Sequence, residues 1–223
     1  MVDVFTVNGD NNLMETSSRF ITIEGAEGVG KSTCIAVVES WLEGQGLSYV
    51  STRDPGGTPL GEKLRALLLD PASGTIDPLA ELMMMFASRA QHVSEVIKPA
   101  LALGQWVVCD RFTDSTYAYQ GGGRGLSMEV IRQIEQVALQ GFTPDLTLVL
   151  DLPVDDGLER VANRGERDRF EREQRVFFER VRNAFMQRAA GGDHYRVIDA
   201  SGTEKVVGSR VRRTLKEFLG SVD

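Results

Sequence analysis

Residues 19–32 read Arg-Phe-Ile-Thr-Ile-Glu-Gly-Ala-Glu-Gly-Val-Gly-Lys-Ser, a short apolar strand that leads through Gly25-x-x-x-x-Gly30-Lys31-Ser32 into a helical pattern. The glycines let several backbone N–H groups converge on one phosphate, and the helix adds its positive N-terminal end. Lys31 can reach the β- and γ-phosphates, and the Ser32 hydroxyl can ligate Mg²⁺. The alternative is a glycine-rich turn beside a surface lysine. We expect a nucleoside triphosphate to contact Gly25, Ala26, Glu27, Gly28, Val29, Gly30, Lys31, Ser32 and Thr33.

Apolar strand-like runs alternate with helical patterns along the rest of the chain. The strand-like runs are 20–23, 47–51, 106–109, 146–150 and 195–198. The helical patterns are 31–45, 60–70, 77–103, 127–140, 154–163, 171–190 and 203–219. Such alternation is typical of a parallel sheet covered on both faces. We predict an α/β fold with a five-stranded parallel sheet flanked by helices, and ligands at the carboxyl edge of the sheet.

Bulk composition fits one such domain. The chain has 223 residues, 42% of them hydrophobic, and a formal net charge of −7. We therefore predict a flexible N-terminal extension over 1–18 and a single domain over 19–223. The extension lacks the basic and apolar regions of a secretory signal, and no apolar run approaches the length of a membrane span. The acidic balance gives no sign of nucleic-acid or membrane binding, so local arginines must hold any anionic substrate.

The two cysteines, Cys34 and Cys109, have no CxxC spacing. They argue against a disulfide framework and fit a reducing cytoplasm. The two histidines, His92 and His194, are isolated in the sequence, so a zinc site is not expected. We interpret both histidines as ordinary surface or packing residues.

Charged residues follow several of the expected strands. Arg53 and Arg111 each follow one, and guanidinium groups match phosphate oxygens bidentately. Together they suggest a second phosphate site, which implies a phosphorylated acceptor. Asp110 ends a strand and could hold Mg²⁺ beside Ser32, or could instead cap the next helix. Asp151 holds a similar place, but we interpret it as structural.

The segment 164–169 contains Arg164, Arg167 and Arg169 and precedes a long helical pattern. One interpretation is a lid, at about 163–172, that closes on phosphates and stabilises the charge of the group being transferred. The other is a solvated helix start with Glu/Arg pairing. The spacing alone leaves these two alternatives open.

Other segments could form the acceptor pocket. Glu27 lies within the phosphate loop, where an inward-pointing carboxylate would repel a triphosphate, so we expect it to point across the site toward the acceptor. The apolar run 83–86 is typical of a helical core, yet Phe86 with Arg89 on the same face could hold a base by stacking and hydrogen bonding. We interpret the glycine-rich segment 120–125 as a flexible loop beside this pocket.

In combination these motifs resemble the bacterial thymidylate kinases, a family of P-loop nucleoside monophosphate kinases. The resemblance covers about 20–219, nearly the whole chain beyond the extension. It rests on the motifs Glu24-Gly-Ala-Glu-Gly-Val-Gly-Lys-Ser32, Arg53-Asp-Pro-Gly-Gly-Thr58, Phe86-Ala-Ser-Arg89, Asp110-Arg-Phe112 and Ala118-Tyr-Gln-Gly-Gly-Gly-Arg-Gly125.

The resemblance implies transfer of the ATP γ-phosphoryl group to dTMP with Mg²⁺, giving ADP and dTDP for dTTP biosynthesis, and a homodimer. It implies that Phe86 stacks on thymine and that Arg89 bonds the edge of the base. Glu27 would contact the sugar hydroxyl, and Arg53 and Arg111 would hold the acceptor phosphate. The remaining residues that it places in the dTMP pocket are Thr116, Tyr119 and Gln120.

Some members of the family carry an arginine directly after the phosphate-loop lysine, where this chain has Ser32; in the others the lid supplies the arginine. The resemblance therefore assigns catalytic roles to Lys31, Arg111 and the lid arginines Arg164, Arg167 and Arg169. Two positions depart from the family pattern. Asp54 stands where many members have glutamate, and Phe112 stands where tyrosine or histidine is usual.

Two other functions remain open at this stage. A kinase for another monophosphate, such as a cytidylate or guanylate, would share the fold and most of the motifs. A nucleotide-dependent switch or binding module would share the phosphate loop, but it would not need Arg53, Phe86, Arg89 and Arg111 on the acceptor side. An acceptor panel separates these possibilities.

Overall fold

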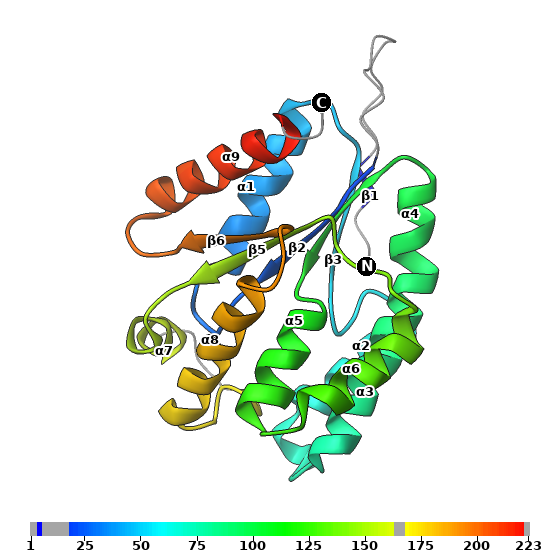
Figure 1. Ribbon diagram of the computed structural model, residues 1–223, viewed down its shortest axis with the longest axis vertical. Helices are drawn as coiled ribbons and strands as arrows, with labels where there is room; N and C mark the ends of the chain where they lie inside the picture. Colours follow the sequence, from blue (N-terminus) through cyan, green and yellow to red (C-terminus); the bar gives the residue numbers. More distant parts are fainter. Residues whose placement is uncertain (1–3, 6–17, 163–167, 221–223) are drawn as a thin grey trace.

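A computed structural model describes residues 4–5, 18–162 and 168–220 of the chain. A six-stranded sheet with the strand order β1-β3-β4-β2-β5-β6 forms its centre (Figure 1). The strands are β1 (Val4–Phe5), β2 (Phe20–Glu24), β3 (Tyr49–Arg53), β4 (Trp106–Asp110), β5 (Leu146–Asp151) and β6 (Tyr195–Asp199). The five from β2 to β6 are parallel, which confirms the predicted sheet.

The sixth strand was not expected. Val4 and Phe5 pair antiparallel with Val50 and Tyr49 at the edge of the sheet. They lie within the segment that the sequence suggested was a flexible extension. The rest of that segment up to Ser17 is outside the described residues.

β2 occupies the middle of the sheet because β4 and β5 pair with it on either side. All five of its residues are buried. The chain passes from β2 to β3 and β4 on one side, then to β5 and β6 on the other. Ligands of open parallel sheets bind at such a switch point, outside the carboxyl ends of the strands.

Helices cover both faces of the sheet. They are α1 (Lys31–Gly44), α2 (Pro59–Leu69), η1 (Pro71–Ser73), α3 (Pro78–His92), η2 (Val93–Ile97), α4 (Lys98–Ala102), α5 (Thr113–Thr116), η3 (Tyr117–Gly123), α6 (Met128–Leu139), α7 (Val154–Ala162), α8 (Arg175–Ala189) and α9 (Glu204–Gly220). In Figure 1, α1 and α9 lie side by side against one face, and α5 and α8 lie against the other. All seven expected helical segments are present, although α8 begins at Arg175 because a turn occupies the preceding residues.

The starts of α2 and α3 follow standard capping chemistry. Thr58 accepts a hydrogen bond from the Gly61 N–H and precedes Pro59, which fixes the first turn of α2. Asp77 does the same for α3 by accepting from two backbone N–H groups ahead of Pro78. These caps set where α2 and α3 begin, and the two helices pack against each other.

The glycine-rich segment 120–125 is not a flexible loop. Most of it belongs to η3, which continues α5 without interruption as a π-helix. A Cβ on Gly123 would lie 2.4 Å from the Phe177 ring, and one on Gly122 would lie 2.8 Å from Ala184. The glycines are therefore needed for the close approach of α8 rather than for mobility.

The buried apolar side chains form two hydrophobic clusters. One contains Ile21, Val38 and Leu42 together with the inner faces of α8 and α9. The other contains Phe20 and Phe112, whose rings meet edge to face at 5.0 Å. Among the described residues, no helix is both long and apolar enough to cross a membrane.

Candidate functional site

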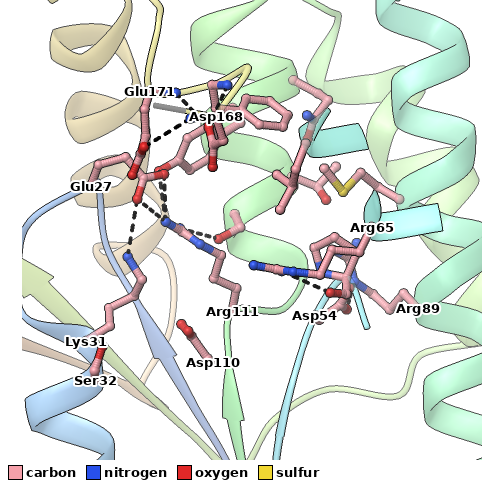
Figure 2. Close-up of a pocket in the computed structure, with 18 of the residues that line it drawn as sticks. Glu27, Lys31, Ser32, Asp54, Arg65, Arg89, Asp110, Arg111, Asp168 and Glu171 are labelled. Atoms are coloured by element: carbon pink, nitrogen blue, oxygen red, sulfur yellow. Dashed lines mark hydrogen bonds and ion pairs between the residues drawn. The ribbon is translucent and has the colours of Figure 1, made fainter. Parts of the chain in front are cut away.

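A cavity of about 230 Å³ opens at the carboxyl edge of the sheet, beside β2, β3 and β4. In Figure 2, Arg111 lies between a group around Glu27 and a group around Asp54 and Arg89. The lining residues are Glu27, Gly28, Gly30, Lys31, Ser32, Asp54, Pro55, Arg65, Leu69, Met85, Arg89, Asp110, Arg111, Ser115, Thr116, Tyr119, Gln120, Asp168, Phe170 and Glu171. The cavity therefore collects residues from loops far apart in the sequence, as the predicted sheet required.

The phosphate loop forms one wall and is held tightly by α7. Gly28 has φ 72° and Gly30 has φ 94°, conformations that favour glycine. A Cβ on Gly28 would lie 2.1 Å from the Gly157 carbonyl oxygen, so only glycine fits against α7 here. Arg160 of α7 donates to the Gly28 carbonyl oxygen at 3.3 Å. The loop is thus a preformed cradle at the start of α1.

Lys31 lies across this cradle. Its Nζ donates to the carbonyl oxygens of Gly25 at 3.2 Å and Ala26 at 2.9 Å, and lies 3.9 Å from a Glu27 oxygen. Burial and the nearby Arg111 guanidinium lower the pKa of Lys31. The approach of an anion would relieve both effects, so Lys31 is prepared to bind phosphate oxygens.

Arg111 is the centre of the site. It has φ 68°, a left-handed conformation that is uncommon outside glycine and that turns the chain sharply at the end of β4. Its Nη1 donates to the Gly25 carbonyl oxygen at 2.9 Å and to Ser115 Oγ at 3.0 Å. Its Nη2 donates to both Glu27 oxygens at 2.9 Å and to the Tyr119 hydroxyl at 3.1 Å. The guanidinium therefore joins the phosphate loop to the helix that follows β4.

The Glu27 carboxylate is ionised at neutral pH. Burial alone would raise its pKa, but the charges of Arg111 and Lys31 and the Tyr119 hydroxyl outweigh burial and lower the pKa to about 2. Tyr119 donates to Glu27 at 2.8 Å. Glu27 thus points across the cavity toward Arg111 and Tyr119.

Ser32 and Asp110 both line the cavity beside Lys31. Asp110 lies at the end of β4, and Arg53 is its partner in β3. Its Oδ1 is buried, and none of the described residues bonds to it. An orphaned carboxylate oxygen at this place is suited to a cation or to a water molecule bound to one.

At the opposite end of the cavity, Asp54 and Arg89 form a sealed ion pair. Arg89 Nε donates to Asp54 Oδ2 at 2.6 Å, and both side chains are at most 1% exposed. Arg89 Nη2 donates to the Phe112 carbonyl oxygen at 3.1 Å. The shorter Asp54 side chain therefore reaches its arginine without difficulty, and Phe112 contributes its backbone rather than a polar side chain.

Three buried polar atoms at this end have no partner within the part of the chain that the structure describes. They are Asp54 Oδ1, Arg89 Nη1 and Thr116 Oγ1, and all three residues line the cavity. Buried polar groups are nearly always hydrogen-bonded in a complete structure. Three orphaned atoms around one cavity therefore indicate the place of a polar ligand.

Phe86 is not part of the cavity. It is 2% exposed and packs in the core cluster with Phe20 and Phe112, where Arg89 lies over its ring at 4.9 Å. Its neighbour Met85 lines the cavity instead. The sequence suggested Phe86 for this position, one residue too late. Residues four apart lie on the same face of a helix, so the spacing from Arg89 back to Met85 is the signal that indicates Met85.

Tyr119, Thr116 and Gln120 line the cavity as expected. They lie on the helix formed by α5 and η3, directly after Arg111. Gln120 donates to Glu81 of α3 at 2.7 Å. Ser115, which the sequence analysis did not single out, also lines the cavity and contacts Arg111.

Arg53 does not line the cavity. Its side chain is exposed and forms an ion pair with Glu62 at 2.8 Å. Arg65 of α2 lines the cavity in its place and donates to the Pro55 carbonyl oxygen at 3.1 Å. Burial and the charges of Arg53 and Arg111 lower the pKa of Arg65. Attention to strand ends alone missed this helical arginine.

The three lid arginines are placed unequally. Arg164 and Arg167 lie outside the described residues. Arg169 is bound away from the phosphate loop: its Nε donates to the Leu68 carbonyl oxygen at 2.8 Å, and its Nη2 pairs with the buried Glu81. Its neighbour Phe170 lines the cavity. In this structure Arg169 anchors the segment to α2 and α3.

Asp151 agrees with the structural interpretation. It pairs with Arg182 of α8 through two bonds of 2.7 and 2.9 Å and does not line the cavity. His92 is also structural, since its Nε2 lies 2.7 Å from Thr52 Oγ1 in the interior.

Comparison with known proteins identifies the family of this site. The sequence profile described as "Thymidylate kinase" matches residues 23–211. The chain belongs to the thymidylate kinase family. A curated thymidylate kinase of Chromohalobacter salexigens is 54% identical over 92% of this chain and 99% of its own length. Those of Ectopseudomonas mendocina and Teredinibacter turnerae are 54% and 49% identical, over 90% and 91% of this chain and over 96% and 100% of their own lengths.

Membership of the thymidylate kinase family agrees with the resemblance seen in the motifs. The matched region runs from β2 into α9 and so includes every element that lines the cavity. Family membership and cavity geometry therefore concern the same part of the molecule.

Proposed function

We propose that the protein is a thymidylate kinase that transfers the γ-phosphoryl group of ATP to dTMP, giving dTDP and ADP. The observation that carries the proposal is one cavity with two chemically different ends. One end is the phosphate loop with Lys31 and Arg111, and the other has orphaned polar atoms on Arg89 and Thr116. A nucleoside monophosphate that lies between them would present its phosphate to the first end and its base to the second.

The base end favours an imide edge. Arg89 Nη1 can only donate, so it suits a carbonyl oxygen and cannot accept from an exocyclic amino group. The Thr116 hydroxyl can accept from an adjacent ring N–H. Thymine and uracil offer this carbonyl and N–H pattern, whereas cytosine offers an amino group and a lone pair. Guanine shares the pattern, so a test of specificity must include it.

Met85 would supply the apolar surface against the base. It takes the role that the sequence resemblance gave to Phe86, because Met85 lines the cavity and Phe86 lies in the core. A thioether is flexible and polarizable and packs well against aromatic rings.

The acceptor phosphate would bind to Arg111 and Arg65. Both face the cavity, and the pKa of Arg65 is lowered by burial and by neighbouring positive charges, Arg111 among them, which a phosphate would offset. Arg111 would exchange its contacts to Glu27 for contacts to phosphate. Glu27 would then be free to accept a hydrogen bond from the sugar hydroxyl.

Residues suited to Mg²⁺ are present. Asp110 Oδ1 is buried without a described partner, and Ser32 lies at the same end of the cavity. Mg²⁺ usually binds with one or two protein oxygens, phosphates and water, so this small donor set fits it. We propose that Ser32 and Asp110 hold the ion, which would neutralise phosphate charge when bound.

The protein's contribution to the reaction is positioning and charge. Lys31 would bind the transferring phosphoryl group, and Arg111 would hold the attacking acceptor phosphate in line with it. No general base is needed, because the attacking phosphate oxygen is already ionised. The lid arginine that stabilises the negative charge on the transferring phosphoryl group would be Arg164 or Arg167, since Arg169 pairs with Glu81.

We further propose that the protein is a cytoplasmic homodimer. Both cysteines, Cys34 and Cys109, are unpaired and buried, which fits a reducing compartment. Exposed apolar side chains gather on the adjacent helices α2, α3 and α6, and such patches often mark interfaces. They include Leu67, Leu79, Met83, Val130 and Val137.

The test is ADP release from ATP and Mg²⁺ with dTMP, dUMP, dCMP, dGMP or UMP as acceptor. We expect a strong preference for dTMP. Faster release with another acceptor would preserve the kinase and overturn the specificity. Nucleotide binding without acceptor-dependent release would favour the switch or binding module.

A matched pair of variants would connect this specificity to the base end. Thr116→Val removes the orphaned hydroxyl at constant shape and should raise KM for dTMP about tenfold, the size of one lost hydrogen bond with a buried partner. KM for ATP should not change. Thr214→Val is the control, because that hydroxyl donates to the Arg210 carbonyl oxygen within α9 and Thr214 does not line the cavity. Equal effects of the two variants would argue against the proposed base contact.

A further inference from the structure

Glu24 is a buried carboxylate that the proposed mechanism does not use. It ends β2, immediately before the phosphate loop, and its residue exposure is 0%. It does not line the cavity. Burying a carboxylate is costly, so its presence beside the site requires a reason.

All the described side-chain hydrogen bonds of Glu24 go to the segment that follows Arg111. Its Oε1 accepts from the backbone N–H groups of Phe112 at 2.7 Å and Ser115 at 3.3 Å. Its Oε2 accepts from the Ser115 hydroxyl at 2.6 Å. Glu24 of β2 therefore caps the start of α5, where no neighbouring side chain in the sequence does so.

These bonds hold the backbone turn at Arg111. The turn places Arg111 at φ 68°, which is unfavourable for a residue with a Cβ. The Arg111 N–H donates to the Ile23 carbonyl oxygen at 3.0 Å, and the next N–H, of Phe112, donates to Glu24. Two consecutive residues of β2 thus hold the two consecutive N–H groups of the turn.

Ser115 transmits the same constraint to the guanidinium. A hydroxyl has one hydrogen, and Glu24 as an ionised carboxylate can only accept it. The Ser115 oxygen is therefore left with lone pairs, one of which accepts from Arg111 Nη1 at 3.0 Å. The ionised Glu24 carboxylate therefore fixes the direction of both hydrogen bonds: Ser115 donates to Glu24 and accepts from Arg111. A hydrogen-bond donor in place of the carboxylate would force the Ser115 hydroxyl to turn the other way.

From this geometry we infer that Glu24 is a positioning residue for the acceptor phosphate, which acts by fixing the backbone turn at Arg111 and the direction of the Ser115 hydroxyl. The inference rests on the proposed function, since it assumes that Arg111 binds the phosphate of dTMP. With Nη1 held by Ser115 and Gly25, Nη2 is the part of Arg111 that is left to exchange Glu27 for substrate.

The direction of the pKa shift of Glu24 argues against a purely stabilising role. Burial and the adjacent Asp114 raise its pKa to about 7, against the opposing bonds from Ser115 and the charge of Arg111. The folded state therefore binds this proton more tightly than the unfolded chain does. Stability is lost as the pH rises from about 4.5 through about 7, and at pH 8 the ionised side chain is a net cost. The ionisable groups that face it are Asp114, Arg111, Lys31, Tyr195 and Cys109.

The decisive variant is Glu24→Gln, assayed at pH 8. The glutamine oxygen can still accept from the two backbone N–H groups, but its NH₂ group must donate to Ser115 and so reverses the hydroxyl. We expect KM for dTMP to rise about tenfold, with KM for ATP changed less than about twofold, because only the acceptor contact depends on Arg111. We also expect a melting temperature at pH 8 equal to or above that of the unaltered protein. A purely structural role would lower the melting temperature and change both KM values.

Ser115→Ala provides the second measurement and keeps the cap on the Phe112 N–H. It removes the hydroxyl that Glu24 orients, so its effect on KM for dTMP should match that of Glu24→Gln, and the double variant should be no worse than either single one. Glu135→Gln is the matched control, since Glu135 accepts from Tyr117 on the same helix, away from Arg111. The control should leave both KM values unchanged.

The possible outcomes separate this inference from the proposed function. If the unaltered protein releases no ADP with dTMP, the proposed function and the inference both fail. If it is active and Glu24→Gln or Ser115→Ala leaves KM for dTMP unchanged, the inference alone fails. Fully additive effects in the double variant would also overturn it, because two independent contacts would then be involved.

Discussion

The two ion pairs of the cavity, Asp54–Arg89 and Glu27–Arg111, each join a carboxylate to a guanidinium. They differ in burial and in how many of their charged atoms have hydrogen-bond partners. Asp54 and Arg89 are sealed from solvent and share one bond of 2.6 Å, and each keeps one atom without a described partner. Glu27 and Arg111 are 19% and 15% exposed. Their charged atoms are bonded to each other and to Tyr119, Ser115 and Gly25.

This difference assigns the two pairs different tasks. The Asp54–Arg89 pair is rigid and incomplete, so a base can add to it without breaking any bond. The Glu27–Arg111 pair is complete, so a phosphate must replace part of it. In the proposed reaction the base end would therefore be prepared in advance, whereas the phosphate end would exchange an internal carboxylate for the substrate. Loss of Arg111 should then affect turnover, and loss of Arg89 should affect stability.

The largest effect is expected at the exchanging pair. Arg111→Lys keeps one positive charge but cannot contact Gly25, Ser115 and a phosphate at the same time. We expect kcat/KM for dTMP to fall about a thousandfold, equivalent to about 4 kcal/mol of transition-state stabilisation. KM for ATP and the melting temperature should change little. Steady-state kinetics with each substrate varied in turn would measure this.

Arg132→Lys is the matched control for that substitution, because Arg132 forms an exposed pair with Glu129 on α6. It should behave as the unaltered protein. A loss below about tenfold for Arg111→Lys would mean that one positive charge is sufficient, and the distinction between the two pairs would lose its basis.

The sealed pair should respond in stability instead. Arg89→Met preserves much of the side-chain volume but leaves the Asp54 carboxylate buried without its cation. We expect the free energy of unfolding to fall by about 3–5 kcal/mol, as is usual when one partner of a buried pair is removed. Urea unfolding followed by circular dichroism would measure it.

The double variant Arg89→Met/Asp54→Asn identifies the cause of that loss. Removing the second charge should recover a substantial part of the stability while dTMP binding stays weak, since Arg89 Nη1 is still absent. An equal loss in the single and double variants would attribute the effect to packing against Phe86 and Phe112 rather than to charge.

The fold could be predicted from sequence because its signals are local. Apolar runs separated by helical patterns defined the five parallel strands, and the motif between 25 and 32 located β2. The errors occurred where tertiary contact overrides local composition. The glycines at 121–123 suggested a mobile loop, yet they allow α8 to approach η3 closely, and no pattern within the segment reveals that partner.

The site was predicted unevenly for the same reason. Asp110 ends β4, Arg111 follows it directly, and Lys31 begins α1 after the phosphate loop, so the order of strands and loops is enough to place them. Met85 and Arg65 line the cavity in place of the predicted Phe86 and Arg53, because packing sets the rotation of α3 and α2 about their axes. The role inferred for Glu24 depends on a contact across 91 positions of sequence, so only the structure could show it.

The smallest effect is expected for Glu27→Gln, and it is a change in melting temperature that depends on pH. Glu27 has a folded-state pKa lowered from 4.5 to about 2, so its charge stabilises the fold above about pH 4.5, and that contribution is lost as the pH falls toward 2. Glutamine has no such dependence. The unaltered protein should melt about 6–12 °C higher than the variant at pH 7, because lowering a pKa from 4.5 to about 2 corresponds to about 3 kcal/mol, and the difference should shrink steadily between pH 4.5 and pH 2.5. Calorimetry across this range would measure it, with Glu217→Gln as a control, because Glu217 lies 3.9 Å from Arg213 at the exposed surface of α9. A difference that persists unchanged to pH 2.5 would show that Glu27 acts through shape rather than charge, and a phosphate would then have no charged competitor to displace from Arg111.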